Sequence, residues 1–307
     1  MTYTPAKICL LVSTFAVCLP SVSAVSQEAE RSVRIWKGIA PGETTESLGV
    51  ALARRKGEVP PATRIKDITA ATLDIFRPDA DKNTGTAVII CPGGGYNYCV
   101  VDKEGSEIAQ RLNEVGVTGI VLRYRTKRPT GDDTLWARPL QDAQRAIRWV
   151  RSHAQELEIQ PDQVGVMGCS AGGQLAALTL TRFDEPSYET RDTIDELSCR
   201  PDFGLLIYPW RLVEGNTTQL NPALTINSKT PPTFLVHTHD DSSTSLSSIA
   251  FYTQLKFHGV PAELHLFETG GHGYGLRPVK NSIVHTWGDR AIDWLARRDL
   301  SHPRSVK

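Results

Sequence analysis

Apolar runs of the kind that form β-strands alternate with segments of helical periodicity along most of this chain. Seven such runs lie at residues 69–76, 86–91, 118–124, 163–168, 202–208, 232–238 and 262–268. Their continuous apolar character is typical of strands that are buried on both faces. The alternation of strands with helices predicts the α/β class, with a mainly parallel central sheet and helices on both faces.

Between these runs, apolar residues recur three or four positions apart, which is the spacing of an amphipathic helix. The longest stripe lies in PLQDAQRAIRWVRSHAQEL and consists of Leu140, Ala143, Ile147, Val150 and Ala154. Shorter stripes are formed by Ile108, Leu112 and Val115, and by Trp287, Ala291 and Trp294. Because no internal repeat or low-complexity linker interrupts the pattern, we expect a single domain over 63–300 after a lead-in over 25–62.

The net charge excludes some classes of partner. The 307 residues include 34 basic and 34 acidic side chains, which cancel. Such a chain lacks the electrostatic footprint that nucleic acid or an anionic membrane surface requires. We therefore expect no nucleic-acid partner, and a neutral small or polymeric molecule as the binding partner.

The first 24 residues, MTYTPAKICLLVSTFAVCLPSVSA, have the pattern of a secretory signal. Lys7 supplies a positive charge, an apolar run extends from Ile8 to Leu19, and Val22 and Ala24 have the spacing that a signal peptidase recognises. The run is short for a membrane span, so we expect no stable membrane insertion. Residues 1–24 are predicted to be a cleaved signal peptide, which would make the protein secreted or periplasmic.

Four cysteines remain after such a cleavage. They are scattered and form no C-x-x-C pair, so they indicate neither a zinc site nor a disulfide scaffold. We interpret them as buried thiols: Cys91, Cys99, Cys169 and Cys199.

The segment GVMGCSAGGQ places Ser170 between Gly168 and Gly172. QVGVMG is typical of a strand and SAGGQLAALTLT of the start of a helix, so Ser170 lies at a sharp strand-to-helix turn. Glycines two residues before and after are needed because the backbone crosses closely there, and the turn lifts the hydroxyl clear of the sheet. Ser170 is therefore the candidate nucleophile. Cys169 is expected to be a packing neighbour, since Met167 stands where that turn would need glycine.

Backbone amides near this turn can stabilise a developing oxyanion. The first amides of a helix have no partner inside the helix, so Ala171 is expected to supply one donor. The loop CPGGGY at 91–96 directly follows a strand, and its Gly94 and Gly95 would let backbone N–H groups approach a substrate. Taken alone, PGGGY also fits a plain tight turn.

A serine hydroxyl is a weak nucleophile without a base. Among eight histidines, His272 lies in a glycine-flanked loop, ETGGHGYGL, after the strand at 262–268. His237, His239 and His265 lie in or beside strands and are interpreted as structural.

An acid is expected to orient the imidazole. Asp240 and Asp241 both follow the strand at 232–238. Neighbouring side chains on an extended chain point to opposite sides, so only one of them can face His272.

Together these segments resemble the α/β-hydrolase esterases of the secreted type, close to the acetylxylan-esterase-like and feruloyl-esterase-like (BD-FAE-type) proteins. The resemblance covers about residues 63–297, through ICPGGGY, LRYR, PLQDAQRAIRWVR, GVMGCSAGG, PTFLVHTHDD and GVPAELHLFETGGHGYGL. Two positions depart from the pattern. Pro92 stands where many lipase-type relatives have histidine, and Gln174 replaces a histidine common after Ser-Ala-Gly-Gly.

The resemblance implies the α/β-hydrolase fold and a triad in the chain order Ser170, Asp, His272. In the family pattern the acid lies four residues beyond a histidine that closes the strand. His237 then selects Asp241, which leaves Asp240 to the loop or to solvent.

The implied mechanism is acyl transfer through the serine. Ser170 attacks an ester carbonyl, His272 takes its proton, and water later releases the acyl group. The amide of Ala171 and those of Gly94 and Gly95 hold the oxyanion. No metal or organic cofactor is implied.

The expected substrates are short-chain, acetyl-type esters on plant or algal polysaccharide or oligosaccharide. The two segments that would cover the site, 181–198 and 214–232, are polar and lack the apolar surface that a long acyl chain needs. One alternative is a serine peptidase of the prolyl-oligopeptidase-related type, disfavoured because the chain has no propeller segment or evident Glu-Glu clamp. Another is a catalytically silent hydrolase fold used for binding, although every triad candidate is present.

Overall fold

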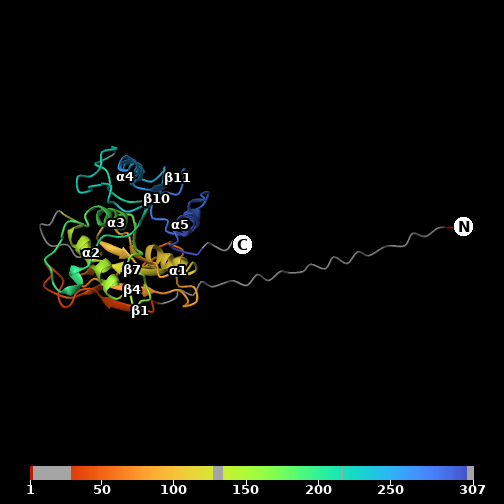
Figure 1. Cartoon of the computed structure of the whole chain (residues 1–307). Helices are drawn as coiled ribbons and strands as arrows, with labels where there is room; N and C mark the ends of the chain where they lie inside the picture. Colours follow the sequence, from red (N-terminus) through yellow and green to blue (C-terminus); the bar gives the residue numbers. More distant parts are fainter. Residues whose placement is uncertain (3–28, 127–133, 216, 303–307) are drawn as a thin grey trace.

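An eight-stranded sheet runs through the middle of the molecule, with helices on both sides (Figure 1). The computed structural model describes residues 1–2, 29–126, 134–215 and 217–302. The strands lie in the order β1 (Arg31–Arg34), β4 (Thr72–Phe76), β7 (Thr118–Arg123), β5 (Ala87–Cys91), β8 (Val164–Cys169), β9 (Gly204–Ile207), β10 (Thr233–Thr238) and β11 (Ala262–Phe267). In this order the last six strands, from β7 to β11, are parallel, whereas β4 is antiparallel to β7 and β1 is antiparallel to β4.

All seven predicted strands are present, and the mainly parallel sheet confirms the α/β prediction. Alternate side chains of each strand serve opposite faces of the sheet. In β5, Ile89 packs into one core cluster, whereas Val88 and Ile90 pack into the other. Complete burial of β5, β8 and β10 explains why their sequences are continuously apolar.

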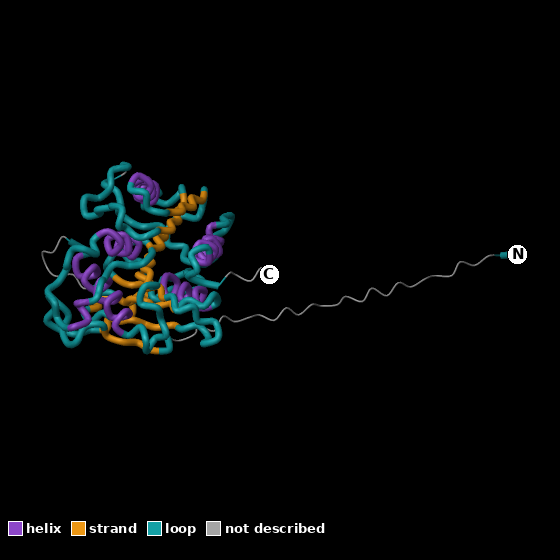
Figure 2. Tube along the Cα trace, viewed as in Figure 1, coloured by secondary structure: helices purple, strands orange, loops and turns teal. Residues whose placement is uncertain are grey.

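The helices supply the outer layers. Figure 2 shows the strands in orange between helices in purple. One face is covered by α1 (Glu107–Asn113) and α5 (Trp287–Ala296). The other face is covered by α2 (Ala137–Ser152), α3 (Ala171–Thr181) and α4 (Leu246–Phe257). The three predicted apolar stripes lie on α1, α2 and α5, except that Val115 and Ala154 follow the ends of α1 and α2. All of their residues are buried, and all but Ala154 belong to the two clusters.

A second, three-stranded antiparallel sheet lies beside the main one. It consists of β2 (Leu48–Ala51), β3 (Arg64–Ile68) and β6 (Tyr98–Val100), and β6 leads into the π-type turn η1 (Asp102–Ser106). The sequence did not predict these strands, because they are short and β2 and β3 are partly exposed. Two 3₁₀ turns, η2 (Thr193–Glu196) and η3 (Val284–Thr286), complete the elements.

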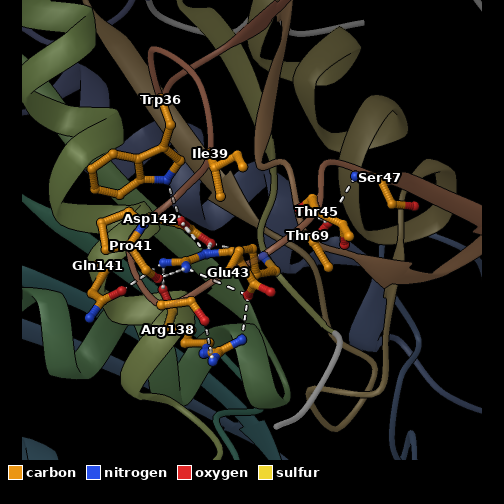
Figure 3. A network of polar contacts seen from close by, with 12 residues as sticks. Trp36, Ile39, Pro41, Glu43, Thr45, Ser47, Thr69, Arg138, Gln141 and Asp142 are labelled. Atoms are coloured by element: carbon orange, nitrogen blue, oxygen red, sulfur yellow. Dashed lines mark hydrogen bonds and ion pairs between the residues drawn. The ribbon is translucent and has the colours of Figure 1, made fainter.

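The predicted lead-in is joined to the rest of the domain. Its strand β1 pairs with β4, and Trp36 is buried against the core. The Trp36 indole N–H donates to Asp142 of α2 at 2.7 Å (Figure 3). Arg125, fully buried after β7, binds the same carboxylate at 2.9 Å and donates to the Pro41 carbonyl at 2.6 Å. A buried polar network thus holds residues 36–43 of the lead-in against the rest of the domain.

Among the described residues, no helix is long and apolar enough to cross a bilayer, and no group of three or more histidine, cysteine or acidic side chains is arranged to hold a metal ion. The four cysteines named above are buried free thiols, as predicted. The predicted signal peptide lies, apart from Met1 and Thr2, outside the described residues.

Candidate active site

Ser170 lies in the turn between β8 and α3. Its backbone has φ 56° and ψ −120°, a left-handed conformation that costs a residue with a side chain on the order of 1–3 kcal/mol. A Cβ atom at Gly168 would lie 1.9 Å from the Gly172 carbonyl oxygen, and one at Gly172 would lie 2.0 Å from the Cys91 carbonyl oxygen. The backbone therefore crosses as closely as the sequence predicted, and glycine is required at both positions.

The structure brings Ser170 together with His272 and Asp241. Ser170 Oγ lies 2.7 Å from His272 Nε2, and His272 Nδ1 lies 2.7 Å from Asp241 Oδ2. His272 is in the loop after β11, and Asp241 is in the loop after β10. The carboxyl ends of three parallel strands thus place a hydroxyl, an imidazole and a carboxylate in one line of hydrogen bonds.

The Asp241 carboxylate is buried and fully partnered. Its Oδ2 also lies 3.1 Å from His237 Nε2, and its Oδ1 accepts the Ser243 N–H at 2.6 Å. Burial acts to raise the pKa of this carboxyl, but the hydrogen bonds from His237, His272 and the Ser243 amide outweigh burial and hold the pKa well below its usual range. An ionised Asp241 keeps the proton of His272 on Nδ1, which leaves Nε2 free to accept the serine proton.

His237 is buried, and its Nδ1 lies 2.9 Å from the Ser248 hydroxyl. It is therefore a satisfied structural histidine, as interpreted from the sequence. Its direct contact with Asp241 is a further role that the sequence did not reveal.

Asp240 does not reach His272. Its carboxylate accepts the N–H groups of Gly270 and Gly271 at 3.1 and 2.9 Å, and these bonds, the Gly271 amide foremost, lower its pKa. Asp240, in the loop after β10, thus stabilises the turn at Gly270 and Gly271 that leads into His272.

A cavity of about 350 Å³ opens beside Ser170 and His272, with Gly94 and Gly95 in its wall. Gly94 has φ +137°, and a Cβ atom there would lie 1.9 Å from the Tyr98 carbonyl oxygen. The glycine loop therefore passes close to its neighbours at the edge of the cavity, and position 94 requires glycine. Ala171 is buried as the first residue of α3, where its N–H has no partner earlier in the helix.

Two polar residues of this region, Glu104 and Tyr208, were not predicted from the sequence. Glu104, in η1, lines the cavity and accepts the Gly93 N–H at 2.9 Å. Tyr208, directly after β9, donates its hydroxyl to Glu104 at 2.9 Å. In the sequence, Glu104 is one charge in the polar stretch DKEGSE, and only the position of Tyr208 at a strand end offered a signal.

The positions that depart from the family pattern are well packed. Gln174 accepts from the Tyr96 hydroxyl and donates to the Arg211 carbonyl, both at 3.1 Å, so the glutamine has its own buried partners. The Pro92 carbonyl accepts from the Tyr124 hydroxyl at 2.7 Å. Cys169 is fully buried, and burial raises the pKa of its thiol, which makes it the packing neighbour that was predicted.

Comparison with known proteins gives a consistent picture. The BD-FAE family model matches residues 73–199. The acetylxylan esterase of Xylanibacter ruminicola is 28% identical over 236 residues, which are 69% of this chain and 45% of that protein. Endo-1,4-beta-xylanase B of Butyrivibrio fibrisolvens is 28% identical over 206 residues, 61% of this chain and 32% of that protein. The chain thus spans less than half the length of these curated relatives.

Solved structures match over more of their length. The acetyl ester-xyloside bifunctional hydrolase of Caldicellulosiruptor lactoaceticus is 30% identical with a TM-score of 0.66, covering 91% of this chain and 99% of that one. An esterase of Thermogutta terrifontis with bound butyrate shares the fold, at 22% identity, a TM-score of 0.65 and coverage of 77% of this chain and 92% of that one. The chain belongs to the α/β-hydrolase esterases that resemble acetylxylan and feruloyl esterases, a family of carboxylic ester hydrolases.

Proposed function

We propose that this protein is a serine esterase that removes short acyl groups, acetyl above all, from acylated plant or algal polysaccharide or oligosaccharide. The observation that carries the proposal is the line of hydrogen bonds from Ser170 through His272 to Asp241 at the edge of a small polar cavity. The similarity of this chain to an acetylxylan esterase and to an acetyl ester-xyloside bifunctional hydrolase supports an acetylated carbohydrate as the substrate.

In the proposed mechanism, Ser170 Oγ attacks the ester carbonyl while His272 Nε2 accepts its proton. Asp241, held ionised by its hydrogen bonds, stabilises the imidazolium that forms. The Ala171 N–H and an N–H of the glycine loop, at Gly94 or Gly95, stabilise the oxyanion. His272 then gives its proton to the leaving alcohol. A water molecule, activated by the same imidazole, releases the acid and regenerates Ser170.

The lining of the catalytic cavity supports a short acyl group. Of the described residues that line it, only Val100 and Tyr98 have predominantly apolar side chains. Pockets for long acyl chains are lined mainly by apolar side chains. The remainder of the wall is backbone at the glycines and polar or charged side chains, namely Arg55, Glu58, Arg64, Asn97, Lys103 and Glu104.

A second, larger cavity of about 920 Å³ supports a carbohydrate alcohol. It lies on the Asp241 side of the site, and Trp210 in its wall is bonded to the nucleophile through its backbone, because the Trp210 N–H donates to the Ser170 carbonyl at 2.9 Å. An aromatic ring combines with hydroxyl and amide groups, an arrangement that suits the alternating apolar and polar faces of a sugar. The polar lining includes Asn221, His239, Ser242, Ser243 and Ser245.

The proposal is tested with 4-nitrophenyl esters of increasing chain length and with acetylated xylan. We expect kcat/KM to be higher for the acetate than for the octanoate, and acetate to be released from the xylan. Ser170→Ala should lower kcat by about a million-fold, because the attacking atom is lost. Faster hydrolysis of the octanoate would refute the acyl preference.

A fluorophosphonate probe separates the esterase from a catalytically silent binding protein. We expect the parent protein to be modified at Ser170 and Ser170→Ala to remain unlabelled. A folded parent protein that takes up no label and hydrolyses no ester would support the binding alternative.

Export is part of the same proposal, because an extracellular polysaccharide must meet its esterase outside the cytoplasm. It rests on the positive, apolar and small-residue pattern of residues 1–24. N-terminal sequencing of the protein recovered outside the cytoplasm should begin at Val25. A mature protein that still begins at residue 1 would contradict it.

A further inference from the structure

One buried carboxylate connects the two loops on which the proposed chemistry depends. Glu104 is only 4% exposed. Its Oε2 accepts the Gly93 N–H at 2.9 Å, and its Oε1 accepts the Tyr208 hydroxyl at 2.9 Å. The Tyr208 oxygen in turn accepts the Gly275 N–H at 3.1 Å, in the loop that carries His272.

We infer that Glu104 is a positioning residue for ester hydrolysis, which holds the glycine loop and the His272 loop in their active arrangement. The inference rests on the proposed roles of Ser170 and His272. Glu104 itself takes no part in the bond-forming steps, since it acts through Gly93 and Tyr208.

The contact with the glycine loop is very close. A Cβ atom placed on Gly93 would lie 2.5 Å from Glu104 Oε2 and 2.9 Å from the Ser170 Cβ. The carboxylate, the glycine loop and the nucleophile thus meet at one point. Because the Gly93 N–H donates to Glu104, that amide fixes the loop and is not available to an oxyanion.

The contact with the histidine loop passes through Tyr208. The Tyr208 ring packs edge-on against the His272 imidazole, with centroids 5.2 Å apart, and against the Tyr274 ring at 4.3 Å. The hydrogen bond from Tyr208 to Glu104 fixes how far this ring extends toward the His272 imidazole. The rotation of the imidazole toward Ser170 is therefore limited by a ring that Glu104 holds in place.

The local backbone is shaped to turn this side chain inward. Glu104 has φ −113° and ψ 15°, a non-helical conformation inside η1. Single π-type turns of this kind occur often at functional sites. The two donors that meet the carboxylate, an amide and a phenol, require an acceptor at each oxygen. A glutamine at this position offers only one acceptor oxygen and would have to turn its NH₂ group toward a donor.

The inference is tested on the full-length chain with Glu104→Ala, Glu104→Gln and Tyr208→Phe. The readouts are kcat and KM for 4-nitrophenyl acetate and the rate at which a small fluorophosphonate modifies Ser170. We expect Glu104→Ala to lower kcat and the modification rate by about a hundredfold, the cost of a small misplacement of catalytic groups, with KM within about threefold. Glu104→Gln should recover part of the loss, because one of the two acceptors remains. Tyr208→Phe keeps the ring but loses the hydrogen bonds to Glu104 and Gly275, and it should lower kcat.

Glu114→Ala is the matched control, since Glu114 is an exposed glutamate that pairs with Arg111 on the surface. It should leave both rates unchanged. If Glu104→Ala lowers the melting temperature but each folded molecule keeps the parent kcat, the residue is merely structural and the inference is wrong. If Glu104→Ala does not fold, Glu104→Gln decides the question: an unchanged kcat and modification rate in that variant also refute the inference.

Failure of the proposed function gives a different result. If Ser170→Ala hydrolyses 4-nitrophenyl acetate as fast as the parent, Ser170 is not the nucleophile, and both the proposed function and this inference fail. If Ser170→Ala is inactive while Glu104→Ala is as active as the parent, only the inference about Glu104 fails. Loss of activity on xylan alone concerns the substrate proposal and leaves Glu104 unaffected.

Discussion

His237 Nε2 and Asp241 Oδ2 lie 3.1 Å apart, and that same oxygen is the one that binds His272. The carboxylate thus lies between two imidazoles, one buried against Ser248 and one facing the nucleophile. The buried imidazole keeps the carboxylate from rotating. This contact also explains why a histidine four residues earlier accompanies the proposed acid: strand β10 ends between the two residues, and the loop returns Asp241 to the side chain of His237.

Replacing each of the two adjacent aspartates separates their roles. Asp241→Asn should lower kcat by roughly a thousandfold or more, because asparagine does not hold the His272 tautomer that accepts the serine proton. Asp240→Asn should stay within about tenfold, since its amide oxygen can still accept from one of the two glycine amides that Asp240 binds. Steady-state kinetics of both folded variants at one pH checks this, and the reverse ranking would move the assignment to Asp240.

The stability lost in Asp241→Asn should depend on pH. The pKa of Asp241 is lowered in the folded protein, so its ionised form stabilises the fold at pH values above the unfolded pKa of about 4. This contribution disappears as the pH falls through the lower, folded pKa. Urea unfolding should therefore show a large difference in unfolding free energy between parent and variant at pH 7 and a smaller one at pH 3. A difference that does not vary with pH would argue against an ionised, hydrogen-bonded Asp241.

The two glycines of the proposed oxyanion loop should respond differently to alanine. Gly94→Ala places a Cβ atom against the Tyr98 carbonyl, so the loop must move, and kcat should fall by about a hundredfold or more. At Gly95 the nearest atom, Asn97 Nδ2, would lie 3.4 Å away, and φ is +61°. Gly95→Ala keeps its N–H and should cost about 1–2 kcal/mol of stability with activity within about tenfold. Parent-like kinetics in Gly94→Ala would place the second donor elsewhere.

Trp210→Ala tests the larger cavity as the place where a sugar chain lies. For acetylated xylo-oligosaccharides we expect kcat/KM to fall by about tenfold, mainly through KM, which corresponds to about 1.4 kcal/mol of lost aromatic contact. For 4-nitrophenyl acetate the change should be within about twofold, since the backbone bond to Ser170 is retained. Phe257→Ala, at an exposed aromatic on α4, is the control. Equal losses on both substrates would mean that Trp210 supports the nucleophile and does not bind sugar.

Arg125→Met tests the network that holds the N-terminal segment. Arg125 and Asp142 are both fully buried, so removing the guanidinium leaves a buried carboxylate with fewer partners. We expect the free energy of unfolding to fall by about 3–5 kcal/mol in urea titrations. Arg31→Met removes an exposed ion pair with Glu156 and should cost less than about 1 kcal/mol. Similar losses in the two variants would mean that the network contributes no more than a surface pair.

The main sheet could be predicted because its central strands are buried on both faces and must therefore be apolar along their whole length. In TAVIIC and PTFLVHT nearly every residue belongs to such a buried strand and indicates it in the sequence. Strands such as β1, RSVR, carry no such signal, since pairing at an edge leaves most of their side chains exposed. No strand was therefore predicted in the lead-in over 25–62, although Arg125 and Asp142 bind it through contacts between residues more than 80 positions apart in the chain.

Some residues of the candidate site could likewise be predicted from the sequence and others could not. Ser170 is marked by local geometry, because the glycines around it are needed whatever the rest of the chain does. Glu104 is marked only by its tertiary partners, the amide of Gly93 and the hydroxyl of Tyr208, and the latter lies 104 residues further along the chain. A single sequence does not reveal such a partnership, since an identical glutamate in a polar stretch is ordinarily exposed to solvent.

The order of the strands also decides when the site is complete during synthesis. From β8 to β11, neighbours in the sheet follow one another along the chain, so the ribosome releases the serine turn first, the aspartate loop next and the histidine loop last. Ser170 precedes His272 by 102 residues. A nascent chain that has already formed its central strands thus carries the proposed nucleophile without its proposed base, and the proposed reaction begins only after β11 has docked at the edge of the sheet.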